Sequence, residues 1–181
     1  MNKSAPDKNL ELIAFFGAVS MFFAAIEFLF PKPLPFLRLG LANIPIILAL
    51  RIFNFKELMI LTIIKVAGQG IVNGTLASYV FIFSALGSVF SMLTMFALDR
   101  TLKSKISLIG ISVGGALASN SVQTVLSLFV IFGKNAWVII PYFMGIGLAA
   151  GIAVGFFAER FNRKSEWFAH IKQNFGAVNA S

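Results

Sequence analysis

The sequence has no cysteine, a single histidine and few charged residues, and each shortage excludes a class of chemistry. Without cysteine there can be no disulfide, no thiolate metal site and no cysteine nucleophile. The one histidine, His170, lies near the end of the chain, where we expect it to be an exposed interfacial residue. Only 12% of the 181 residues are charged, too few to cover a soluble domain of this length.

The usual enzymatic motifs are also missing from the sequence. It has no aspartate-rich DDxxD site for a metal diphosphate, no Walker A loop and no glycine-rich dinucleotide turn. No two acids stand within one helical turn of each other in an apolar segment. We therefore expect no enzymatic activity, and the sequence implies no metal or cofactor. Binding of nucleic acid is not expected either, because the basic residues form no patch on a soluble fold.

Long apolar segments dominate what the chain does contain. Hydrophobic residues make up 58% of it, 21 residues are phenylalanine, and the mean hydropathy is +0.88. These values predict an integral membrane protein, and the lack of short alternating strands predicts an all-α bundle. The segments recur too often to be a signal peptide, so we expect Met1 to stay with the mature chain. We predict six transmembrane helices, at residues 10–30, 39–53, 57–73, 77–98, 106–132 and 136–158.

The basic residues are distributed unequally between the two sides of such a membrane domain. Opposite the termini, the loops contain only Lys32, Arg38 and Lys134. On the side of the termini the basic residues are Lys3, Lys8, Arg51, Lys56, Arg100, Lys103, Lys105, Arg160, Arg163, Lys164 and Lys172. The positive-inside rule therefore predicts that both termini are cytoplasmic, in a bacterial inner membrane.

We divide the chain into a transmembrane domain, residues 1–158, and a cytoplasmic amphipathic tail, residues 159–181. In the tail, Trp167, Phe168, Ile171 and Phe175 share one helical face, which is typical of a helix lying on a membrane surface among lipids. Small residues recur at every fourth position in two apolar segments. They predict close helix packing by Gly110, Gly114 and Ala118 in one segment and by Gly147, Gly151 and Gly155 in the other.

Strongly polar side chains inside the apolar segments fall mainly in the outer half of the predicted membrane. At 1.5 Å per helical residue, Lys65 lies about 12 Å from the cytoplasmic start of its segment, and the other helical positions lie about 18 to 25 Å deep. The residues are Glu27, Arg38, Asn43, Lys65, Gln69, Asn73, Asn120 and Gln123. Polar groups are unfavourable in lipid, so we expect them to face inward and form one outward-open pocket for a small molecule. Tyr79 and Tyr142 are candidates for stacking on its apolar part.

A structural role is the alternative for these residues. Glu27 could form a buried clasp with Lys65 or Arg38, and the amides could hold helices together by hydrogen bonds. Two connections face the outer side, the proline-rich residues 30–36 and the glycine-rich residues 68–78. The first is expected to be extended and stiff, as either a lid or a taut connector.

Two stretches resemble a family of membrane transport proteins. The residues AFFGA at 14–18 place Ala14 and Ala18 in the AxxxA spacing of the first helix of substrate-binding S components of energy-coupling factor transporters. Residues 37–65, LRLGLANIPIILALRIFNFKELMILTIIK, look like the flavin-type segment with an acid or amide, then Ile-Pro, a short helix, a cytoplasmic turn and a lysine-bearing helix. From about 10 to 158 the chain resembles the Gx transporter family, often labelled heptaprenyl diphosphate synthase component I.

The resemblance implies a membrane subunit that binds a vitamin or a vitamin-like precursor, either flavin-like or related to quinones and isoprenoids. It also implies that Ala14 and Ala18 contact a transmembrane scaffold, which works with two cytoplasmic ATPases. Flavin-binding members often have aspartate where Asn43 stands, so the chain departs from the flavin-type pattern at this position. Two other functions stay open: an accessory membrane subunit of polyprenyl (heptaprenyl) diphosphate synthesis, and a membrane subunit of flavin or quinone electron transfer.

Overall fold

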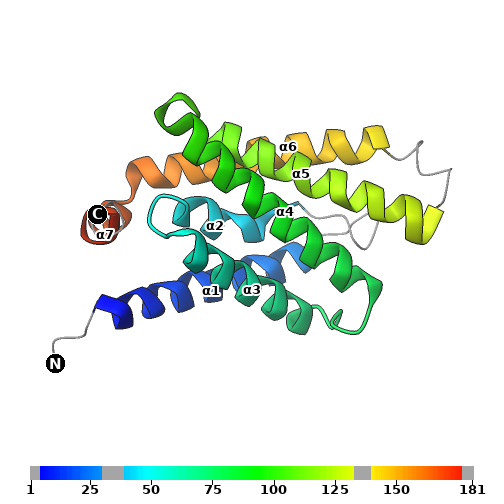
Figure 1. Ribbon diagram of the computed structural model, residues 1–181, viewed down its shortest axis with the longest axis horizontal. Coiled ribbons are helices and arrows are strands. Elements are labelled where there is room, and N and C mark those ends of the chain that lie inside the picture. The colour runs from blue at the N-terminus through cyan, green and yellow to red at the C-terminus, as the bar shows by residue number, and fades with distance from the viewer. Residues whose placement is uncertain (1–4, 30–38, 133–139, 177–181) are drawn as a thin grey trace.

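A computed structural model of the chain describes residues 5–29, 39–132 and 140–176, and this part is helical without strands. Its elements are α1 (Ala5–Leu29), the 3₁₀ turn η1 (Leu41–Asn43), α2 (Ile44–Ala49), α3 (Phe55–Val72), α4 (Tyr79–Leu102), the 3₁₀ turn η2 (Lys103–Lys105), α5 (Leu108–Ser127), the π-helical turn η3 (Leu128–Phe132), α6 (Ile140–Lys164) and α7 (Glu166–Gly176) (Figure 1). The prediction of an all-α protein is confirmed over these residues.

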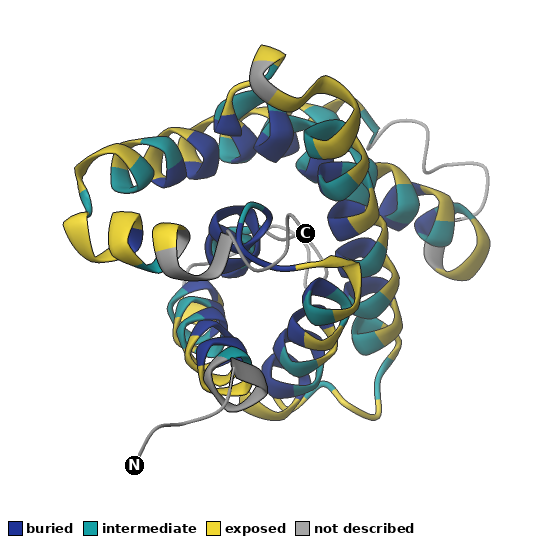
Figure 2. Cartoon of the chain, turned by 60° about the vertical axis from the view of Figure 1, so that its left-hand side comes forward, coloured by how far each residue is buried: buried dark blue, intermediate teal, exposed yellow. Residues whose placement is uncertain are grey.

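Four of the described helices are long and apolar enough to cross a membrane. They cover residues 9–29, 79–102, 108–130 and 140–164. Buried residues face the middle of the bundle, and exposed residues lie on its outside (Figure 2). Many of the exposed side chains are large and apolar, including Phe22, Ile63, Phe129, Leu148 and Phe156. A surface of this kind suits hydrocarbon rather than water, so the chain is a membrane protein.

The second predicted membrane helix, at residues 39–53, is not a continuous helix. It consists of η1, the six-residue α2 and a turn that leads to α3. Gly40 has a left-handed φ of 82°, and Pro45 stands in the first turn of α2, so regular helix cannot start before this point. At 1.5 Å per residue α2 is about 9 Å long, well short of a 30 Å hydrocarbon core.

α3 lies close to the position predicted for the third segment and begins with a well-formed cap. The Asn54 side chain accepts from the Glu57 backbone N–H (3.0 Å), and the Glu57 carboxylate accepts from the Asn54 N–H (2.9 Å). α3 carries Lys56, Glu57 and Lys65 within 18 residues. These charges distinguish α3 from the four strongly apolar helices.

The helices are arranged around α2. All six α2 residues are buried, and α2 contacts α1, α3, α5 and α6. α1 packs against α3, and α5 packs between α4 and α6. α1 begins and α6 ends at the same end of the molecule, beside α7 and the turn between α2 and α3 (Figure 1).

Glycine allows α5 and α6 to approach closely, as predicted for Gly151 and Gly155. A Cβ atom on Gly155 would lie 2.6 Å from the Ile109 Cα, and one on Gly151 would lie 3.0 Å from the Val113 Cα. These contacts are with backbone atoms, which cannot turn aside as a side chain can. The predicted stripe on α5 packs differently, because Gly114 faces the Leu98 side chain of α4.

The tail is divided differently from the prediction. α6 continues to Lys164, so the first six residues of the predicted tail belong to the bundle helix. Ser165 then starts α7, its hydroxyl accepting from the Phe168 N–H at 3.2 Å. The apolar face of α7 packs on protein, since Phe168 is buried beside Phe161 and Trp167 lies 5.3 Å from Phe15, between ring centroids. The predicted surface helix therefore docks against the bundle.

Candidate functional site

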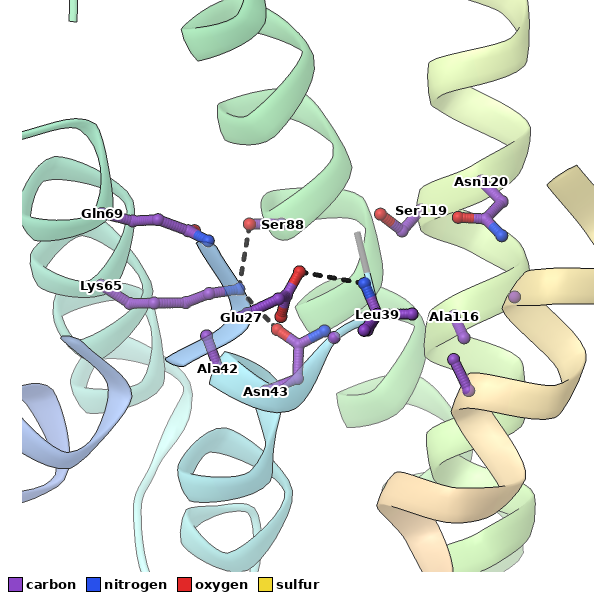
Figure 3. A pocket seen from close by; sticks show the side chains of 13 residues that line it. Glu27, Leu39, Ala42, Asn43, Lys65, Gln69, Ser88, Ala116, Ser119 and Asn120 are labelled. Atoms are coloured by element: carbon purple, nitrogen blue, oxygen red, sulfur yellow. Dashed lines mark hydrogen bonds between the residues drawn. The ribbon is translucent and has the colours of Figure 1, made fainter. Parts of the chain in front are cut away.

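A small polar cavity lies where α1, α3, α4, α5, α6 and the Leu39–Asn43 segment meet (Figure 3). Its volume is about 30 Å³, room for one or two water molecules. The lining residues are Glu27, Leu39, Gly40, Ala42, Asn43, Lys65, Gln69, Ser88, Ala116, Ser119, Asn120, Gly147 and Ala150. Five of them are predicted site residues, Glu27, Asn43, Lys65, Gln69 and Asn120, so residues distant in sequence do converge.

Glu27 fixes the Leu39–Asn43 wall of the cavity. Its two carboxylate oxygens accept from the backbone N–H groups of Leu39 and Leu41, each at 2.9 Å, and Figure 3 shows the bond to Leu39. The start of η1 has N–H groups without partners inside the turn, so a carboxylate is well placed there. Glu27 thus clasps the backbone of this segment, and its pairing with Lys65 or Arg38 stays a prediction.

Lys65 joins three elements from a buried position, with 3% of its surface exposed. Its Nζ donates to the Asn43 Oδ1 and to the Ser88 Oγ, the latter at 3.0 Å. The bond to Asn43 orients that amide, whose nitrogen points away from Lys65 (Figure 3). These bonds compensate part of the cost of keeping an ammonium group away from water.

Gln69 lies one turn after Lys65 on the same face of α3 and extends toward the cavity (Figure 3). It is only 2% exposed, and its Oε1 has no hydrogen-bond partner in the described part of the chain. A buried amide oxygen without a donor is unfavourable by about 1 to 3 kcal/mol. Gln69 is therefore a polar group available to a molecule in the cavity.

Asn120 forms the opposite wall and depends on a glycine of α6. Its Nδ2 donates to the Phe143 carbonyl at 2.7 Å, which links α5 to α6. A Cβ atom on Gly147 would lie 1.8 Å from this Nδ2, so only glycine leaves room for the amide. Gly147, predicted only as a packing residue, thus lines the cavity as well.

Two of the predicted amide residues, Gln123 and Asn73, lie away from the cavity. Gln123 is buried one turn beyond Ser119, to whose hydroxyl its Nε2 donates at 3.3 Å, and it does not line the space. Asn73 ends α3, where its buried Oδ1 has no hydrogen-bond partner among the described residues. Both amides share a helix with a lining residue but lie farther along it, beyond the cavity.

The two tyrosines lie on the outside of the bundle. Tyr79 is about half exposed and contacts Phe83 edge-on, and Tyr142 is 71% exposed. Neither lines the cavity in this conformation, so their stacking on a ligand stays a prediction. Arg38 and the proline-rich residues 30–36 lie outside the described residues.

Ser88 and Ser119 line the cavity, although the sequence was interpreted without them. A signal was present for Ser88. Ser84, Ser88 and Ser91 recur at helical spacing in α4, and all three are buried. Hydroxyls on one face of an otherwise apolar helix indicate the side that faces polar neighbours.

Ala14 and Ala18 are exposed on one side of α1, while Gly17 between them faces Ile64 of α3. The small residues therefore form a flat part of the outer surface, next to the contact between Phe15 and Trp167. Their exposure leaves them accessible to another membrane helix.

Comparison with known proteins gives one match. A family model described as heptaprenyl diphosphate synthase component I matches residues 16–161, which include every residue that lines the cavity. No curated protein and no solved structure matches the chain. Because the match covers most of the chain, this membrane protein belongs to the heptaprenyl diphosphate synthase component I family.

Proposed function

We propose that the chain is a substrate-binding membrane subunit, an S component, of an energy-coupling factor importer for a vitamin or vitamin-like precursor, flavin-like or related to quinones and isoprenoids. The observation that carries the proposal is the convergence of Asn43, Lys65, Gln69 and Asn120 on one cavity inside a lipid-facing bundle. The unpartnered Gln69 Oε1 supports a binding role, because packing alone leaves it unsatisfied.

Topology in this proposal consists of six crossings with both termini in the cytoplasm. The second crossing is the interrupted one, made by η1, α2 and the flanking turns. Supporting this orientation, the end of the bundle where α6 finishes also contains the α2–α3 and α4–α5 connections, with Arg51, Lys56, Lys103 and Lys105 (Figure 1).

The cavity is too small for a vitamin in this conformation. Pockets for such solutes measure about 300 Å³ or more, against about 30 Å³ here. Binding must therefore separate the walls, and we expect the movement at Leu39–Asn43, which is the wall that is not α-helical. In the proposal the conformation of this segment differs between the empty and the occupied site. The hydrogen bonds to Glu27 return the segment to its present position when the solute leaves.

The chain itself performs no reaction in this proposal, and transport is powered by partners. A transmembrane scaffold would contact the exposed Ala14 and Ala18, and two cytoplasmic ATPases would act on the scaffold. Small residues on an exposed helix face let a second helix approach closely, which supports this interface.

A matched pair of substitutions tests the cavity. Gln69→Leu and Gln123→Leu each remove a buried amide with an unpartnered Oε1, but only Gln69 lines the cavity. Small molecules that copurify with the full chain are identified by mass spectrometry, and their affinities are measured by calorimetry. We expect Gln69→Leu to weaken binding about tenfold and Gln123→Leu to leave it unchanged. Equal affinity in both variants and the wild type would exclude this cavity as the binding site.

The second candidate function is an accessory membrane subunit of heptaprenyl diphosphate synthesis, which the family description favours. It would hold a polyprenyl chain or recruit a soluble synthase to the membrane. Native mass spectrometry of the complex from mild detergent separates the two candidates. A scaffold with two ATPases favours import, whereas a bound prenyl synthase favours the second function.

A further inference from the structure

A second hollow lies at the basic end of the bundle, away from the polar cavity. It is formed by the first turn of α5 and the last turns of α6, and its volume is about 300 Å³. The lining residues, called here the basic groove, are Ile109, Phe156, Glu159, Arg160, Arg163 and Lys164. None of them lines the polar cavity.

The charge of the basic groove favours an anion. Three basic side chains stand around one acid, Glu159, whose Oε1 accepts from the Arg163 Nη2 at 2.7 Å. Arg160 and Lys164 are exposed and form no ion pair with any described residue. Ile109 belongs to the first turn of α5, where the helix dipole is positive and where Ser107 Oγ already caps the Gly110 N–H at 3.1 Å. A phosphate group would be stabilised by Arg160, Lys164 and the positive end of α5, because Arg163 offsets the charge of Glu159.

An apolar stripe leads away from the basic groove along α6. Leu148, Ile152 and Phe156 follow one another at every fourth residue and are all exposed, and Arg160 comes next on the same face. From Leu148 to Arg160 the helix rises about 18 Å, close to one leaflet of a hydrocarbon core of about 30 Å. The stripe and the groove together have the length and polarity of one membrane lipid.

We propose that the basic groove binds the phosphate of an anionic phospholipid, with an acyl chain lying along Leu148, Ile152 and Phe156. The phosphate is placed between Arg160 and Lys164, because Arg163 is already paired with Glu159. This site is independent of the polar cavity, and it holds whether or not the chain is an importer. Its occupant fixes the depth of α6 in the membrane.

Native mass spectrometry of the full-length protein in detergent tests the proposal. Dioleoylphosphatidylglycerol, dioleoylphosphatidylcholine and inorganic phosphate are titrated separately, and the affinity for the first bound molecule is measured. The variant Arg160→Gln/Lys164→Gln leaves the Glu159–Arg163 pair intact. The control Lys56→Gln/Lys105→Gln removes the same charge from exposed positions outside the groove.

We expect the groove variant to bind phosphatidylglycerol at least about tenfold more weakly, and the control to bind like the wild type. Phosphatidylcholine and inorganic phosphate should bind weakly to all three proteins. Phosphatidylcholine has no net negative charge, and inorganic phosphate has no acyl chain. If phosphatidylglycerol binding weakens equally in the groove variant and the control, the proposal is overturned. The lipid would then be attracted by the overall positive charge of the protein and not by the groove. Displacement of phosphatidylglycerol by equimolar farnesyl diphosphate would also overturn it, since the groove would then prefer a prenyl diphosphate.

Discussion

The polar cavity and the basic groove both contain positively charged side chains, but in opposite surroundings. Lys65 is buried and donates to Asn43 and Ser88, whereas Arg160 and Lys164 are exposed at the end of α6. Inside the bundle polar groups depend mainly on one another and on backbone. At the basic end, water and lipid headgroups can satisfy the charges. Loss of one polar group should therefore have a large effect in the cavity and a small effect at the groove.

Glu27→Gln should have the largest effect on stability. The glutamine amide has one oxygen, which can accept from only one of the Leu39 and Leu41 N–H groups. Its NH₂ group then faces the other N–H, where two donors meet. We expect the free energy of unfolding to fall by about 2 kcal/mol. Unfolding in detergent, followed by tryptophan fluorescence, measures it. The control Glu166→Gln, exposed on α7, should change it by less than about 0.5 kcal/mol, and equal effects would contradict the clasp role.

Gly147→Ala should have an intermediate effect. The new methyl group collides with the Asn120 Nδ2, so the bond to the Phe143 carbonyl must lengthen or break. We expect a loss of about 1 kcal/mol in the same unfolding measurement, near the lower end for overpacking, because the end of the Asn120 side chain can shift. Gly145→Ala, two residues earlier, meets nothing within 4 Å and should stabilise α6 by roughly 0.5 kcal/mol. If Gly147→Ala stabilises as much as the control, Asn120 does not need this space.

Arg163→Gln should have the smallest effect. It breaks the pair with Glu159, but the Arg163 side chain is 74% exposed, and exposed pairs one helical turn apart contribute less than about 0.5 kcal/mol. Unfolding at low and high salt measures the change, with Arg163→Lys as the charge-preserving control. A loss comparable to that of Glu27→Gln would remove the distinction between the two regions.

Polar residues on α3 and α5 show how far sequence reasoning reaches. Lys65 and Gln69 are one turn apart in an apolar helix, so their shared inward face could be predicted from helical spacing. Asn120 could be assigned to the same pocket because its estimated depth was similar. Gln123 lies at a similar depth but does not line the cavity. Depth along one helix does not show at which level the neighbouring helices pack together and end the cavity.

The outward position of Tyr142 follows from its spacing to the glycines of α6. Gly151 lies nine residues later, and at 100° per residue this is the opposite side of α6. Since the glycine stripe packs on α5, Tyr142 has to face outward, as it does. The interruption of the second segment was harder to predict, because residues 44–53 are apolar apart from Arg51 and resemble part of a membrane helix. Only Gly40 and Pro45 indicated that its helix would be short.

The six-residue α2 has a consequence for how the chain is made. So short a helix cannot rest alone in hydrocarbon, because the peptide groups at its ends would lack hydrogen bonds there. Its partners include α6, which the ribosome completes more than ninety residues later. The packing around α2 therefore cannot be complete until synthesis is nearly finished. Chains that end before Ile140 should remain incompletely folded and be degraded by quality-control proteases.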